Sequence, residues 1–149
     1  MYYKNKKASP LLNNCIIFHR ARKILNMTDK MEISWLEKPQ EHDYTAAQSY
    51  LGLLYKDKAV LLKVDKLRKA KMTQFKSKDI FRASGLSLLG VSNSHVDKDR
   101  KKISSGVALS PLLLVRDVSI GRVIIADGYH RLCAVYTHNE DALIPCKII

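Results

Sequence analysis

The sequence predicts an α+β domain in which helices surround a small mixed sheet. The residues just before Asp127 form a short apolar run rich in β-branched side chains, typical of a buried strand, and a helix-compatible segment follows. A second apolar run, at 112–116, is separated from the one at 122–125 by a polar turn, which is the spacing of a β-hairpin. Together with 73–80 and 143–149, these runs are expected to form the strands of the sheet.

Two helices, which together span 43–71, are expected to form an N-terminal addition to this sheet. Asp43 is a favoured N-cap residue for a helix over 44–55, and a second helix is expected over 57–71. In the first helix, apolar residues recur at the spacing of one helix face. These residues are Ala47, Tyr50, Leu51 and Leu54.

Residues 82–93 are expected to form a loop, and a short helix is expected to begin after Ser94 and to end near Ile103. Ser94 followed by Asp97 resembles a capping box, in which side chains satisfy the free N–H groups of the first turn. Pro145 has no N–H to donate, so part of the last strand is expected to lie at an edge of the sheet.

The formal net charge of +12 favours an anionic partner, but half of it lies in residues 1–26, which contain six Lys and Arg residues and no acid. We expect 1–30 to be a basic extension, either disordered or an artefact of the assigned start, since Met27 and Met31 precede the first patterned stretch. A nucleic-acid-binding arm and an organelle transit peptide are the alternatives. Residues 31–149 are expected to form a single domain.

The composition also indicates the setting of the protein. Three cysteines without Cys-x-x-Cys spacing, and an N-terminal apolar run too short for a signal peptide, favour a reducing, cytoplasmic setting. No apolar run is long enough to cross a membrane.

The segment 127–131, Asp-Gly-Tyr-His-Arg, is the strongest functional signal in the chain. Asp127 is expected to cap the helix that follows, and Gly128 allows the backbone to turn sharply. His130 and Arg131 then lie in the first turn, where free N–H groups and the helix dipole favour an anion. The pattern therefore predicts a phosphate site. The alternative is that both residues are ordinary solvated side chains.

A second helix with a capped start offers further candidate residues for the site. If the helix after Ser94 starts near the same ligand, Ser94 and His95 are expected to contact it together with His130. The alternative for His95 is an exposed position in the first turn.

The segment 124–136 resembles the signature of the ParB/sulfiredoxin superfamily, in which a strand, a glycine turn and a helix opening with His-Arg or Arg-Arg lie next to a nucleotide phosphate. Its Asp127-Gly128-x-His130-Arg131 form is similar to that of free-serine kinases built on this fold. The resemblance covers roughly 72–149 and includes 109–115, which is similar to the proline-containing strand of ParB-like domains. It implies a ParB/sulfiredoxin-like fold and a nucleotide bound at Gly128, Tyr129, His130 and Arg131.

The chain departs from this superfamily at one informative position. Tyr129 occupies the place of the catalytic cysteine in the Gly-x-Cys-His-Arg motif of sulfiredoxins, so reductase chemistry is not expected. ParB clamp proteins carry a helix-turn-helix domain after this fold; thirteen residues follow Tyr136 here, so partition-site binding of that kind is not expected.

The chemistry that these residues offer is phosphoryl chemistry, in which positioning and charge neutralisation supply most of the catalysis. Asp127 has three possible roles: it caps the helix, holds a Mg²⁺ that bridges phosphate oxygens, or orients His130. Asp127 and His130 are therefore the candidate catalytic residues. The expected cofactors are Mg²⁺ and a nucleoside triphosphate or diphosphate.

Three functions remain open on the sequence alone. The first is a nucleotide-binding ParB-like module that acts near DNA through a basic face at 56–82. The alternative for this basic stretch is a solvated helix face without a partner. The second is an enzyme, either a small-molecule phosphotransferase or a nuclease. The third is a non-catalytic protein that binds a partner.

Overall fold

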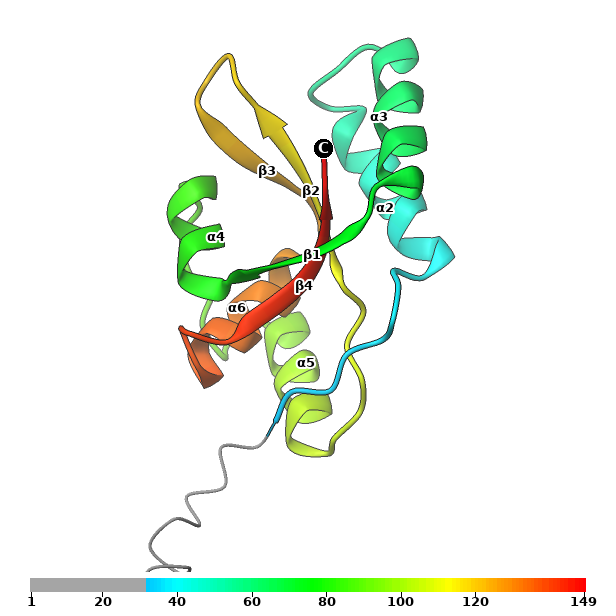
Figure 1. Ribbon diagram of the computed structural model, residues 1–149. Helices are drawn as coiled ribbons and strands as arrows, with labels where there is room; N and C mark the ends of the chain where they lie inside the picture. The colour runs from blue at the N-terminus through cyan, green and yellow to red at the C-terminus, as the bar shows by residue number, and fades with distance from the viewer. Residues whose placement is uncertain (1–31) are drawn as a thin grey trace, which may run out of the picture. The chain divides into compact units, whose positions relative to one another are not determined.

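The structure, a computed structural model, describes residues 32–149 and has at its centre a four-stranded sheet in the order β1-β4-β2-β3 (Figure 1). The strands are β1 (Met72–Lys76), β2 (Leu112–Asp117), β3 (Arg122–Asp127) and β4 (Leu143–Ile148). Two pairs, β1 with β4 and β2 with β3, are antiparallel, whereas β2 and β4 are parallel. The predicted α+β domain with a small mixed sheet is confirmed. The prediction for 1–30 lies outside the described residues.

Helices cover both faces of this sheet (Figure 1). On one face lie α2 (Glu41–Leu51) and α3 (Asp57–Lys69), and on the other lie α4 (Ser77–Ser84), α5 (Ser94–Ser104) and α6 (Tyr129–His138).

The alternation of side chains along β2 explains this arrangement, because successive residues of a strand point to opposite faces. Leu113 and Val115 pack with the buried residues of α2 and α3. Leu112 and Leu114 pack with those of α4, α5 and α6. The sheet is therefore buried on both sides, and α2 and α3 share a core with it.

The predicted strand over 73–80 is only half right. Strand β1 ends at Lys76, and Ser77 begins α4. The N–H of Ser77 donates to the carbonyl of Ala142 at 2.9 Å, and its hydroxyl donates to the carbonyl of Glu140 at 2.7 Å. The turn before β4 thus fixes the start of α4, and this long-range contact leaves no local signal in the sequence.

The predicted role of Asp43 as an N-cap is wrong. Gln40 is the N-cap of α2, and Asp43 is the third helical residue, whose carboxylate accepts the N–H of Gln40 at 2.7 Å. The helix therefore begins before 44 and ends at Leu51 rather than at 55. Asp43 is 1% exposed, so its carboxylate lies inside the domain.

The start of α5 differs from the prediction by one residue. Asn93 is the N-cap, and its side chain accepts the N–H groups of His95 at 3.0 Å and Val96 at 3.3 Å. Ser94 is the first helical residue and not the cap. Pro145 lies in the part of β4 that pairs with β1 alone, since the ladder with β2 begins at Cys146, and this agrees with the predicted edge position.

Within residues 32–149, no helix combines the length and the apolar character that crossing a membrane requires. Cys133 and Cys146 are fully buried, as their positions in a helix and a terminal strand predict.

Candidate functional site

The predicted junction of strand, glycine and helix is present at residues 122–138. Strand β3 ends at Asp127, and Gly128 has a φ of 101°, a backbone conformation that favours glycine. A Cβ at Gly128 would lie 2.7 Å from Cγ of Leu112 and 3.1 Å from Nη2 of Arg131. Both the backbone and the close packing therefore require glycine here.

Asp127 does not cap α6, which corrects the prediction. The N-cap is Gly128, which has no side chain, so no side chain accepts the first N–H groups of the helix. The carboxylate of Asp127 instead accepts a hydrogen bond from Arg131 one turn later. The amides of the first turn of α6 thus have no side-chain acceptor among residues 32–149.

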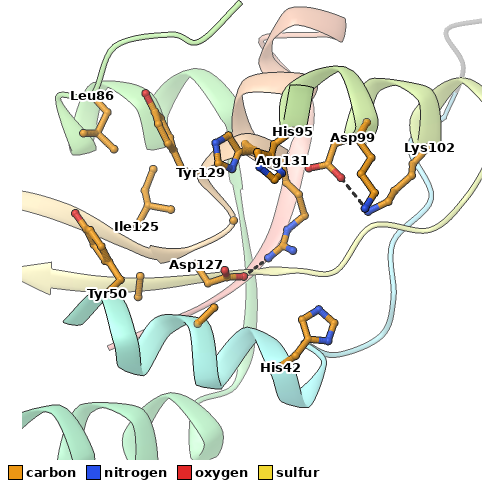
Figure 2. A pocket seen from close by; sticks show the side chains of 15 residues that line it. His42, Tyr50, Leu86, His95, Asp99, Lys102, Ile125, Asp127, Tyr129 and Arg131 are labelled. Carbon is orange, nitrogen blue, oxygen red and sulfur yellow. Dashed lines mark hydrogen bonds and ion pairs between the residues drawn. The ribbon is translucent and has the colours of Figure 1, made fainter. Parts of the chain in front are cut away.

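A pocket of about 650 Å³ opens at this junction (Figure 2), a volume typical of small-molecule sites. Its walls come from α2, α5, the end of β3, the first turn of α6 and the loop after α4. Of the predicted site residues, the pocket brings together His95, Asp127, Gly128, Tyr129, His130 and Arg131. Ser94 does not line it.

His95 and His130 form a stacked pair in the pocket, with ring centroids 4.9 Å apart and an interplanar angle of 30°. Burial lowers the pKa of His130, the charge of a protonated His95 and that of Arg131 lower it further, and Asp99 partly opposes them. His130 is therefore mainly neutral near pH 7 and gains a positive charge as the pH falls.

Arg131 joins α6 to two other elements. Its Nη1 lies 3.2 Å from Oδ1 of Asp43 in α2, and its Nη2 donates to Asp127 at the end of β3. The side chain is only 14% exposed, and its buried Nε makes no hydrogen bond among residues 32–149. The guanidinium, at the wall of the pocket, is thus held by two carboxylates, whereas the sequence predicts it to be directed at a ligand.

The two carboxylates differ in their surroundings. Burial acts to raise the pKa of Asp43, but hydrogen bonds from Ser110 and the Gln40 N–H, with the charge of Arg131, outweigh it and hold that pKa below its usual value. Burial raises the pKa of Asp127, and the charge of Arg131 offsets this only in part. Of these two carboxyls, Asp127 is therefore the one that more readily holds a proton.

Further cationic groups of the pocket come from α5. Lys98 and Lys102 line it on the same helix face as His95, and Lys102 donates to Asp99 at 2.9 Å. No group of three or more His, Cys, Asp or Glu side chains with the geometry of a metal site occurs in the described part of the chain. The carboxylates that line this pocket are those of Asp99 and Asp127.

Sequence reasoning did not find several residues that line the pocket. His42, Ala46 and Tyr50 recur every four residues on α2, on the face next to its buried residues, and Lys98 and Lys102 follow His95 at helical spacing. These spacings could have signalled a shared face. Nothing in the sequence indicates that Leu86, in the loop after α4, completes the wall.

Five of the ten basic residues in the face predicted at 56–82 form ion pairs within the domain. Arg68 pairs with Glu41 and Lys69 with Asp65. Beyond α3, Lys76 and Lys78 both pair with Asp141 and Arg82 with Asp79. DNA binding through this face stays a prediction.

The site thus has histidines, lysines and uncapped helix amides around a pocket wide enough for a small phosphorylated molecule. One half-buried carboxyl, Asp127, which pairs with Arg131, lies beside them. Comparisons with protein-family models, with curated proteins and with solved structures found no match to this chain.

Proposed function

We propose that this chain is a nucleotide-binding domain of ParB/sulfiredoxin-like fold, which holds the phosphates of its ligand at the first turn of α6. One observation carries the proposal: the junction at Gly128 opens into a pocket in which uncapped amides, His95, His130 and Lys98 converge.

The first turn of α6 supplies the primary recognition of phosphate. The N–H groups of Tyr129 and His130 point out of the helix, and the helix dipole adds a partial positive charge there. Because Gly128 has no side chain, nothing in α6 itself competes with a ligand for these donors. An oxyanion is the ligand that this arrangement stabilises best.

The side chains around this turn add charge-assisted hydrogen bonds. His95 and His130 lie against each other, so a phosphate oxygen that reaches one imidazole is near the other. Lys98 adds positive charge from α5, where Lys102 is paired with Asp99, and hydrogen bonds to charged groups are about twice as strong as neutral ones. Arg131 also lines the pocket, but its charge is shared with Asp43 and Asp127, and these two pairs fix the geometry of the junction.

The fold assignment rests on the same junction. The order strand, glycine, His-Arg helix at 122–138 is the element that resembles ParB/sulfiredoxin domains, and the structure has these elements at the predicted residues.

An enzyme of the phosphotransferase or nuclease type is the second candidate, favoured by the raised pKa of Asp127 beside the pocket. Asp127 and His130 would then exchange protons with the substrate. The carboxylates of the pocket suit Mg²⁺ only when a nucleotide is bound as well, because the ion then takes its ligands from one or two carboxylates and from the phosphates. Asp127 would then have to exchange its contact with Arg131 for the ion.

Calorimetric titration with ATP, CTP and ADP, each with and without Mg²⁺, tests the proposal. We expect binding in the wild type and weaker binding by about tenfold in Lys98→Ala, from the loss of one charged hydrogen bond. Lys101→Ala is the matched control, since Lys101 lies on the same helix, is 78% exposed and does not line the pocket.

The same samples, assayed for release of labelled phosphate, separate the candidates. Binding without turnover supports the binding module, and turnover that is lost in Asp127→Asn supports the enzyme. No heat with any of the nucleotides contradicts both.

A further inference from the structure

A second hollow of about 290 Å³ adjoins the pocket at Gly128. The two share Tyr50, Leu86 and Ile125, so the surface of the site continues past these three side chains. Beyond them the second hollow is lined by apolar residues, among them Leu54 and Ile120, and at its far part by Ser84, Asp117 and Arg122. The site is therefore longer than a phosphate group needs.

The two ends of the site differ in chemistry, as Figure 2 shows. His95, Asp99 and Lys102 lie at one end, on α5. Tyr50, Leu86 and Ile125, from three separate elements, lie at the other. A ligand that fills the site thus carries its charge at one end and an apolar or aromatic group at the other.

The apolar end is exposed and yet fixed in position. Tyr50 is 40% and Leu86 is 43% exposed, so both present apolar surface to solvent. The hydroxyl of Tyr129 donates to the carbonyl of Ser87 and ties the loop that carries Leu86 to α6. A fixed apolar wall beside a cationic pocket is the usual construction of a site that orients one ligand.

We infer that Tyr50, Leu86 and Ile125 form the subsite for a planar aromatic ring, a nucleobase, and that the ligand is a nucleoside phosphate, not a free phosphate or a phosphorylated aliphatic molecule. This inference rests on the proposed function, because it takes the phosphates to lie at the first turn of α6. Tyr50 offers its ring as a stacking partner, and every base has a π-face that can use it.

Titration of the full chain with ATP and with inorganic triphosphate tests the inference, since both probes carry three linked phosphates and only ATP carries a nucleoside. We expect Tyr50→Ala to weaken ATP binding about tenfold, as loss of one base–aromatic stack does, and to leave triphosphate binding unchanged. Tyr50→Phe keeps the ring and is expected to bind ATP as the wild type does. Leu53→Ala is the control, because Leu53 lies next to α2, is 81% exposed and lines neither hollow.

A second variant keeps the test decisive if Tyr50→Ala does not fold. Leu86→Ala lies on a different element and is expected to show the same selective loss for ATP. Circular dichroism confirms the fold of each variant.

The outcomes separate the two proposals. If ATP and triphosphate bind the wild type equally and Tyr50→Ala changes neither, the subsite is wrong and the phosphate site stands. If Tyr50→Ala and Leu86→Ala weaken both probes alike, the subsite is also wrong. If the wild type binds neither probe, the proposed function fails, and the subsite fails with it.

Discussion

Nη1 of Arg131 lies 3.2 Å from Oδ1 of Asp43, across 88 residues of sequence. This pair connects the first turn of α2 with the first turn of α6, and its Arg131 lines the pocket. Since Arg131 also pairs with Asp127, one guanidinium fixes three elements around Gly128.

Arg131→Ala is therefore expected to destabilise the domain. The substitution leaves Asp43, which is 1% exposed, as a buried charge without its cation. Breaking a buried pair in this way costs about 3–5 kcal/mol. We expect that loss in the free energy of unfolding, measured by urea denaturation.

Arg82→Ala serves as the control, because Arg82 is 83% exposed and its only ion pair is the surface contact with Asp79 at 3.7 Å among the described residues. It is expected to change stability by less than about 0.5 kcal/mol. A loss below about 1 kcal/mol in Arg131→Ala would mean that the pairing with Asp43 is not important for the fold.

Gly128→Ala tests the junction itself. An alanine needs an unfavourable positive φ, and its Cβ would lie 2.7 Å from Leu112 Cγ. We expect a loss of about 2–4 kcal/mol from the backbone conformation and overpacking together. Gly106→Ala isolates the backbone effect, since Gly106 has a φ of 70° and nothing within 4 Å of its Cβ position. Equal losses in the two variants would argue against close packing at Gly128.

Asp127 gives the stability of the domain a pH dependence. Because burial raises its pKa, the folded protein binds more protons than the unfolded chain between 3.8 and that raised pKa. The stabilisation that protonation of this group provides is complete below 3.8 and is lost as the pH rises through the folded-state pKa. The free energy of unfolding of the wild type, relative to Asp127→Asn, is therefore expected to rise as the pH is lowered from about 7 to about 4.

Chemical denaturation of both proteins across this range measures the difference. Asp43 stays charged in the window, because its pKa is lowered. A difference that is constant, or that falls with falling pH, would contradict the assignment for Asp127.

Phosphate binding is expected to strengthen as the pH falls. Protonation of His130, whose pKa burial lowers, adds a positive charge next to the phosphate. The ratio of CTP affinities of wild type and His130→Gln, measured by calorimetry, is expected to increase between about pH 7.5 and about pH 5.5. Protonation of CTP itself affects both proteins equally and therefore cancels in the ratio. A ratio that does not change with pH would place His130 away from the ligand.

The sequence was sufficient to predict the elements whose signals are local. The hairpin of β2 and β3, the glycine and α6 each follow from a few adjacent residues, and so does the candidate site at 127–131, apart from the cap at Asp127. A carboxylate in front of a helix usually caps it. Here Arg131, one turn further, attracts that carboxylate instead.

The parts that could not be predicted depend on distant contacts. Ser77 ends β1 because it bonds to the turn at 140–142, and Asp43 is a buried ion-pair partner because Arg131 reaches it from α6. The stretch before Ser77 alternates like a strand, and Asp43 has the appearance of a cap. Local pattern therefore identified the residues of the first turn of α6 that line the pocket but not the wall that Tyr50 and Leu86 complete.

The most direct test of the central claim is an NMR titration of the ¹⁵N-labelled protein with ATP. The account predicts that the largest chemical-shift changes occur at the amides of Gly128, Tyr129 and His130, with smaller ones at His95 and Lys98. Lys98→Ala would then require more ATP for the same change. No change at 128–130 at a saturating ATP concentration, or changes confined to α3, would contradict it.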